Sequence, residues 1–159
     1  MNDTMRGAVT PQVGDTLPDL VIRITRKLII AGATASRDWQ PQHHDKDAAR
    51  SAGLSDIIMN NYTQAGLISR YITDWSGPIG RIGRLKFSMR RPVYPDRNVR
   101  FSGSVVAVDG DDGQISWVKV DVTLNDDDAL LTSASVKFAL PAYTSAKSPW
   151  HCHPSEWRP

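Results

Sequence analysis

The sequence predicts an α+β domain in which an antiparallel sheet wraps around one long central helix. One long helical pattern spans residues 60–74, and three consecutive strand patterns joined by short turns come later in the chain. Strands joined by short turns run antiparallel, and a sheet with one apolar face must bury that face against another layer. A length of 159 residues fits one domain of this kind.

The chain divides into an N-terminal arm (1–16), a folded domain (17–141) and a C-terminal extension (142–159). The arm is polar and loosely patterned, and the extension is aperiodic and punctuated by prolines. We therefore expect the extension to be loose or packed against a partner, with Trp150 and Trp157 as aromatic contacts.

Three elements precede the long helix. Residues 19–24 alternate weakly between apolar and polar side chains, which predicts a strand. The apolar run 28–35 is too short for its periodicity to separate a strand from a helix. Asp45 followed by an alanine-containing segment and Gly53 predicts a short helix over 47–52.

The long helix carries a stripe of residues at three- and four-residue spacing. Its members are Tyr62, Ala65, Gly66, Ser69 and Ile72. The small residues in this stripe would let a broad element such as the sheet approach closely. Gly77 and Pro78 end the helix.

Strands fill the rest of the domain. Apolar residues alternate over 85–89, 99–107, 115–124 and 130–140. Turn-forming clusters at 109–113 and 125–128 separate the last three of these strands.

Composition and cysteine content exclude several classes of protein. The net charge of +2 gives no support for a nucleic-acid or membrane-surface protein. The single cysteine, Cys152, excludes a disulfide framework and a four-cysteine zinc site, and three adjacent residues at 151–153 cannot easily converge on one metal ion. No apolar run reaches ~18 residues and no hydrophobic leader is visible, so we expect a cytoplasmic protein without a membrane span or metal site.

The candidates for acid–base chemistry lie together in residues 38–45. This loop holds Asp38, His43, His44 and Asp45 around Pro41. A histidine can take and give a proton near neutral pH, and a nearby carboxylate can hold the same water. A polar loop that merely caps the next helix through Asp45 would have the same composition.

This loop resembles the motif of the MaoC-like (R)-specific enoyl-CoA hydratases, Asp-x-Asn-Pro-x-His-x-Asp followed by Ala and Gly. Here it is Asp38-Trp39-Gln40-Pro41-Gln42-His43-His44-Asp45, then Ala48, Ala49 and Gly53. The segment Arg91-Pro92-Val93-Tyr94-Pro95-Asp96 resembles the Arg-Pro-Val-x-Pro-Gly-Asp turn of the same family. The resemblance covers about residues 15 to 140.

The resemblance implies a hot-dog fold and a hydro-lyase. Asp38 and His43 match the catalytic pair, which holds one water and adds it across the 2,3 double bond of a trans-2-enoyl-CoA to give a (3R)-hydroxyacyl-CoA. Gln40, Pro41, His44 and Asp45 match the supporting loop. Coenzyme A is part of the acyl-CoA substrate, so no separate cofactor is implied.

The chain departs from the family pattern at the start of the long helix. The backbone N–H of Asn61 matches the donor to the thioester oxyanion, at a position where simpler members carry glycine, and Asn60 replaces a histidine. The helix N-terminus keeps this donor function available. We expect Asn60, Arg90 and Arg91 to contact the substrate.

Charge is uneven along the strands. Residues 81–100 hold seven basic residues and one acid, a net +6, and residues 109–128 hold one basic residue and seven acids, a net −6. Some basic residues would meet the phosphates of coenzyme A, or the strand face is simply solvated and its charges oppose the acidic turns. Interleaved aromatics for nucleic-acid binding are missing from this strand.

The departures resemble one sub-branch of the family. His43-His44-Asp45, Asn60 and the segment 70–78 are similar to the catalytic small subunit of heteromeric hydratases that act on steroid side-chain enoyl-CoA thioesters. A lone hot-dog sheet leaves an edge open, so we expect a homodimer or a heteromer with a second hot-dog subunit.

Three other functions compete with this hypothesis. A dehydratase subunit would run the same reaction in reverse on an acyl thioester, and a non-catalytic hot-dog partner subunit would bind without chemistry. A thioesterase would place its carboxylate on or near the central helix, but the only acid there is Asp74, at its far end.

Overall fold

The helices and strands follow the predicted order. The computed structural model describes residues 10–159 except 111–113, 128, 144 and 156. The elements are β1 (Thr16–Ile24), α1 (Arg26–Ala35), the 3-10 turn η1 (Pro41–His43), α2 (Lys46–Ser51), α3 (Asn61–Ser76), β2 (Arg81–Met89), β3 (Arg97–Gly110), β4 (Ile115–Asp126), β5 (Ala129–Pro141) and the 3-10 turn η2 (Pro149–His151). The ambiguous apolar run is helix α1. Residues 1–9 of the predicted arm and residues 111–113 and 128 of the predicted turns lie outside the described residues.

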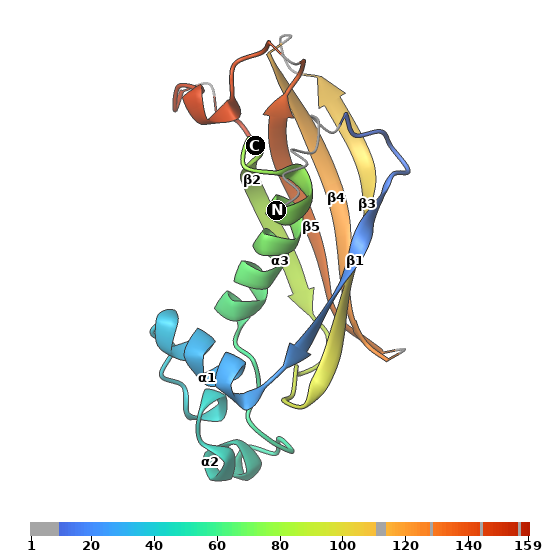
Figure 1. Ribbon diagram of the computed structural model, residues 1–159. Helices are drawn as coiled ribbons and strands as arrows, with labels where there is room; N and C mark the ends of the chain where they lie inside the picture. Colours follow the sequence, from blue (N-terminus) through green and yellow to red (C-terminus); the bar gives the residue numbers. More distant parts are fainter. Residues whose placement is uncertain (1–9, 111–113, 128, 144, 156) are drawn as a thin grey trace, which may run out of the picture.

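The five strands form one sheet in the order β1-β3-β4-β5-β2, with every neighbouring pair antiparallel. Helix α3 lies along one face of this curved sheet, and α1 and α2 gather near the start of α3 (Figure 1). The predicted α+β architecture is confirmed. Strands β1 and β2 are the two edges of the sheet.

The core lies between α3 and the inner face of the sheet. Val118, Val120 and Val122 of β4 alternate with polar neighbours and are at most 1% exposed. The ring of Tyr71 on α3 lies 6.0 Å from that of Phe101 on β3, measured between centroids. Burying each large apolar side chain contributes roughly 1.5–3 kcal/mol, so this layer holds α3 on the sheet.

The predicted inner stripe of α3 was wrong. The buried residues of α3 are Gln64, Ile68, Tyr71, Ile72 and Ser76, and of the predicted stripe only Ile72 is among them. Gln64 contributes to this error, because it is polar but belongs to the buried face of the helix. Its amide accepts a hydrogen bond from Thr132 Oγ1 over 2.7 Å and donates one to Met89 Sδ over 3.4 Å, so a polar residue occupies a core position.

Helix α1 approaches α3 closely at Thr63, a residue outside the predicted stripe. A Cβ atom built on Gly32 of α1 would lie 2.1 Å from Oγ1 of Thr63, so only glycine permits this helix contact. Gly66 lines the same side of α3 as Thr63. The close approach was predicted at the small residues of the stripe, but Gly32 and Thr63 make it, and a Cβ atom on Gly66 would meet nothing within 4 Å.

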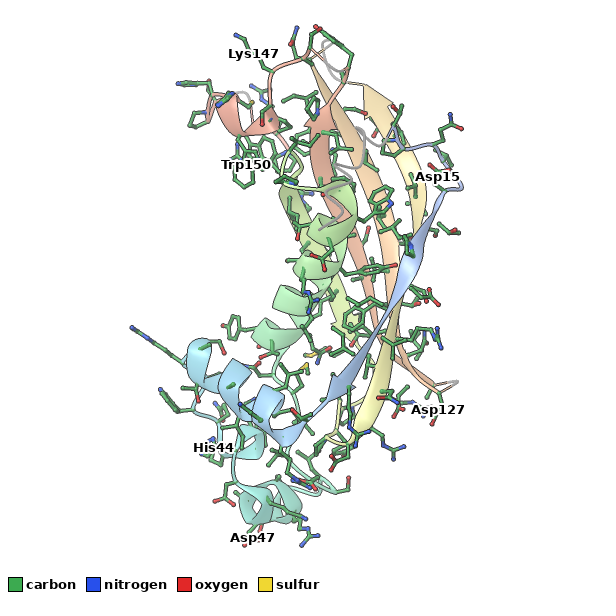
Figure 2. The ribbon with its side chains drawn as sticks, viewed as in Figure 1. Asp15, His44, Asp47, Asp127, Lys147 and Trp150 are labelled. Atoms are coloured by element: carbon green, nitrogen blue, oxygen red, sulfur yellow. The ribbon has the colours of Figure 1, made fainter. Side chains whose placement is uncertain are left out.

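The C-terminal extension packs on the sheet of its own chain. The ring of Trp157 lies 4.8 Å from that of Trp117 on β4, and the guanidinium carbon of Arg81 lies 3.8 Å from the Trp157 centroid. This corrects the expectation that Trp157 would pack against a partner or stay loose. Trp150 is 58% exposed. It lies at the end of the molecule opposite His44 (Figure 2).

Candidate active site

The end of α1 places Asp38. Helix α1 stops at Ala35, and Arg37 adopts a left-handed conformation with φ of 54°. The chain therefore reverses direction, and the N–H of Asp38 donates to the carbonyl of Ala33 over 2.9 Å. The Asp38 side chain is 15% exposed, so it is largely shielded from solvent.

The 3-10 turn η1 places His43. Pro41 begins this turn, and the N–H of His43 donates to the carbonyl of Gln40 over 3.0 Å. Nδ1 of His43 lies 2.8 Å from the carbonyl oxygen of Ile58. A carbonyl only accepts, so Nδ1 carries the proton and Nε2 of the neutral ring keeps its lone pair.

Asp38 and His43 face one another. Nε2 of His43 lies 3.4 Å from Oδ2 of Asp38, and the side chain of His43 is 8% exposed. This separation is longer than a direct hydrogen bond between charged groups. The predicted pair is therefore brought together, and the structure places its two polar atoms side by side without a direct hydrogen bond.

Asn60 joins this pair to the start of α3. Its Nδ2 donates to Asp38 Oδ2 over 3.0 Å and to Ser36 Oγ over 2.8 Å, and its Oδ1 accepts from the N–H of Thr63 over 3.0 Å. Asn60 is 2% exposed. Its contact with substrate stays a prediction. Ser36 was missed by the sequence analysis, because no motif marks a bond across 24 residues.

The N-terminus of α3 leaves one backbone donor free. The N–H of Tyr62 donates to Asn61 Oδ1, and the N–H of Gln64 donates to the Asn60 carbonyl. The N–H of Thr63 donates to Oδ1 of Asn60, as described above. Within the described residues the N–H of Asn61 has no acceptor in the chain. The predicted oxyanion donor is thus the first free N–H of the helix, beside the residue that holds Asp38.

An open groove of about 370 Å³ lies between α1 and α3. It is lined mostly by apolar atoms of Gly32, Ala35, Ser36, Tyr62, Thr63, Gly66 and Leu67. Ser36 belongs both to this groove and to the network around Asp38, so the groove adjoins the Asp38–His43 pair.

Comparison with known proteins identifies the family. A family model described as "MaoC like domain" matches residues 11–127. The chain belongs to the MaoC-like family. The 3-oxo-4,17-pregnadiene-20-carboxyl-CoA hydratase beta subunit of Mycobacterium tuberculosis is 43% identical over 108 residues, which are 68% of this chain and 81% of that protein.

Solved structures agree with this assignment. The ChsH1-ChsH2 complex from Mycobacterium tuberculosis contains a chain with 35% identity and a TM-score of 0.75, covering 81% of this chain and 98% of that one. The (R)-hydratase of A. caviae matches with a TM-score of 0.71 at 22% identity, over 83% of this chain and 98% of that one. The hot-dog fold is confirmed.

The supporting loop of this MaoC-like chain serves mainly structural tasks. Asp45 Oδ1 accepts from the N–H groups of Asp47 and Ala48, so Asp45 caps α2 as the simpler interpretation of the loop expected. His44 and Gln40 are exposed. Pro41 starts the turn that carries His43, and the backbone carbonyl of Gln40 accepts from the N–H of His43.

Arg90 and Arg91 follow β2 and are exposed. Their backbone N–H groups both donate to the carbonyl of Leu131, and among the described residues their side chains form no ion pair or hydrogen bond. The neighbouring Val93 carbonyl accepts from the N–H of Met59 over 2.9 Å, which ties the predicted 91–96 turn to the segment before α3. Substrate contact by the two arginines stays a prediction.

The opposed charges of the strands are partly paired. Arg97 lies 3.7 Å from Asp126 of β4, and Arg100 lies 2.9 Å from Asp19 of β1. Hydrogen bonds from Ser102 and Arg100 lower the pKa of Asp19.

In the described part of the chain no group of three His, Cys, Asp or Glu residues could hold a metal ion. No helix in that part is long and apolar enough to cross a membrane.

Proposed function

We propose that the chain is the catalytic subunit of an enoyl-CoA hydratase, which converts a trans-2-enoyl-CoA into a (3R)-hydroxyacyl-CoA. One observation carries the proposal: Nε2 of His43 and Oδ2 of Asp38 face each other at 3.4 Å in a mostly buried pair. The free N–H of Asn61 lies one residue beyond Asn60, which holds Asp38.

The proposed reaction uses each of these groups. Asp38 and His43 hold one water; its oxygen bonds to C3 while one of its protons passes to the pair. The electron pair of the double bond moves toward the thioester, and the developing enolate oxygen accepts a hydrogen bond from the N–H of Asn61, helped by the α3 dipole. A proton then returns from the pair to C2. The sum is one water added per thioester.

The same groups catalyse the reverse reaction, because a catalyst serves both directions. A dehydratase subunit therefore stays an alternative that differs in its physiological substrate. A non-catalytic partner subunit is the second alternative. It has no need for His43 to be buried with Nδ1 fixed by Ile58 and Nε2 turned toward Asp38.

We further propose a bulky steroid side-chain thioester as the substrate and a second hot-dog subunit as the partner. The relative named as a pregnadiene-carboxyl-CoA hydratase subunit supports the first, and the ChsH1-ChsH2 complex supports the second. In this chain the α1–α3 groove offers an apolar surface beside Asp38 for part of the acyl group. The edge strands β1 and β2 offer unpaired backbone for association.

Hydration of two thioesters tests this proposal. Crotonyl-CoA and 3-oxo-4,17-pregnadiene-20-carboxyl-CoA are supplied to the purified chain alone and to the chain with any co-purifying hot-dog subunit. Conversion of only the steroid thioester, with the partner present, supports the full proposal. Conversion of crotonyl-CoA by the chain alone indicates a general homodimeric hydratase. No conversion of either by folded protein contradicts a catalytic role.

A further inference from the structure

Asn60 and Ser36 lie behind the proposed catalytic pair. We propose that they are positioning residues that hold the carboxylate of Asp38 at its working distance from His43, an inference that rests on the proposed function. Asn60 is buried, and its two ends contact different parts of the structure. Neither residue needs to touch the substrate in this role.

Both donor hydrogens of the Asn60 amide are used inside the chain. Its two N–H bonds go to Asp38 Oδ2 and Ser36 Oγ, and its oxygen accepts from the N–H of Thr63. An asparagine side chain has two donor hydrogens, so no donor remains. Because the same amide caps α3, the carboxylate of Asp38 is tied directly to the helix end that carries the N–H of Asn61.

Ser36 is one of three partners that agree on which way this amide faces. The N–H of Thr63 only donates and the carboxylate of Asp38 only accepts, so both already turn the NH₂ end toward Asp38. The hydroxyl of Ser36 has one hydrogen, which it donates to the carbonyl of Gly32 over 2.8 Å. Its oxygen can then only accept from Asn60, so the NH₂ end of the amide, and not its oxygen, must face Ser36 and Asp38. The orientation that lets Asn60 donate to Asp38 is therefore supported both from α3, through Thr63, and from the end of α1, through Ser36.

The bond from Asn60 explains the open spacing of the catalytic pair. The 3.4 Å between Nε2 and Oδ2 exceeds the 2.7–2.9 Å of a direct charge-assisted hydrogen bond. Oδ2, the atom that faces His43, is also the atom that accepts from Asn60. Holding that oxygen back keeps space for a shared water, and releasing it would let the two side chains move.

Three variants test the positioning role. Ser36→Ala removes the hydroxyl that accepts from one amide hydrogen of Asn60, and Ser36→Thr keeps it. Asn60→Asp keeps an oxygen that caps α3, since aspartate caps helices as well as asparagine, but it removes the donor and places a second carboxylate beside Asp38. Ser51→Ala is the matched control, because Ser51 also donates to a carbonyl four residues earlier, that of Asp47, but on α2 and away from Asn60.

The hydratase assay is run on the complex with the thioester that the wild type converts. Asn60→Asp is expected to lower kcat by about 10- to 100-fold, the range for one hydrogen bond to a charged group, with KM changed less than about twofold. Ser36→Ala removes a hydrogen bond to a neutral amide and is expected to lower kcat by about 2- to 10-fold. Ser36→Thr restores kcat and Ser51→Ala leaves it unchanged. Circular dichroism checks that each variant is folded; the unfolding temperature of Asn60→Asp is expected to fall, because its buried carboxylate repels that of Asp38. Wild-type kcat in both Ser36→Ala and Asn60→Asp overturns the inference while leaving the proposed function intact.

A crystal structure of Asn60→Asp decides the inference even if the wild type converts neither thioester. The Asp38 carboxylate is expected to leave its present position relative to Nε2 of His43. A carboxylate that stays in place, with its distance to Nε2 unchanged, overturns the positioning role. Failure of hydration by the wild type overturns only the proposed function.

Discussion

Gly32 of α1 and Thr63 of α3 meet so closely that a Cβ atom on Gly32 would lie 2.1 Å from Thr63 Oγ1 and 3.0 Å from Thr63 Cβ. Because the Thr63 Cβ is itself close, rotating the threonine side chain cannot make enough room. This contact sets the spacing of the two helices that carry Ser36 and Asn60. The position of the candidate site therefore depends on a glycine that lies outside the motif at residues 38–45.

We predict opposite effects for alanine at the two glycines of this interface. Gly32→Ala lowers the free energy of unfolding by about 1–3 kcal/mol, because the added methyl group separates the helices. Gly66→Ala meets no atom within 4 Å. It raises the free energy of unfolding by about 0.5–1 kcal/mol through helix propensity. Urea unfolding of both variants measures this, and equal effects of the same sign would contradict the described helix contact.

A larger residue at position 66 should affect bulky substrates selectively. Gly66→Leu places a side chain in the groove between α1 and α3, about one turn beyond Tyr62 and Thr63. We expect kcat/KM for the steroid thioester to fall at least tenfold relative to Gly66→Ala, with little change for any short thioester that is converted. An equal loss for both thioesters, or none for either, would show that the acyl group lies elsewhere.

Asp56 is predicted to stabilise the site region in a pH-dependent way. Nη1 of Arg26 donates to Oδ1 of Asp56 over 2.6 Å, and Lys46 lies 3.6 Å from Oδ2. The hydrogen bonds from Arg26 hold the pKa of Asp56 well below its usual range. Asp56→Asn should lower the free energy of unfolding by about 1 kcal/mol at pH 7.

The sign of the pH effect follows from that lowered pKa. A carboxyl whose pKa is lower in the folded state than in the unfolded state, where it is about 3.9, contributes its full stabilisation above that value and loses it as the pH falls. The difference between wild type and Asp56→Asn should therefore shrink from about pH 4 downward. A difference that stays constant from pH 7 to pH 3 would contradict the ion pair. Asp74→Asn, in an exposed pair with Arg70, is the control and should have a smaller effect at pH 7.

Trp157 is predicted to stabilise the end of the sheet opposite the candidate site. Its ring lies on Trp117 and against the Arg81 guanidinium. Trp157→Ala should lower the free energy of unfolding by about 2 kcal/mol and leave hydration unchanged. Trp150→Ala is the matched control and should cost less, since Trp150 is 58% exposed and its ring lies 5.5 Å from Arg81. Equal losses of unfolding free energy in the two variants would mean that packing of Trp157 on Trp117 does not contribute to stability.

Local patterns predicted most of the fold. Alternation identified the strands, Asp45 identified the start of α2, and Gly77 identified the end of α3, because each depends on neighbouring residues. The inner face of α3 was missed, since Gln64 is buried only through partners on β2 and β5. The packing of Trp157 on Trp117 was missed for the same reason, because it joins residues far apart in the chain.

In the candidate site too, features set by neighbouring residues could be predicted and contacts between distant residues could not. Asp38 and His43 share one short loop, so their motif was visible, and the structure brings them to 3.4 Å. The role of Ser36 was invisible, because it depends on how α1 and α3 pack at Gly32. The network at Asn60 joins residues 22 and 24 positions apart, and no local spacing encodes it.

The central claim is that Asp38 and His43 share the reacting water. Its most direct test is hydration by the complex carrying Asp38→Asn or His43→Ala, compared with wild type, with assembly checked by size-exclusion chromatography. Asp38→Asn keeps the size of the side chain and removes its charge. We predict that the wild type forms the (3R)-hydroxyacyl-CoA and that each variant assembles normally but loses ~10²–10⁴-fold in kcat. Normal turnover by a correctly assembled His43→Ala variant would contradict the account.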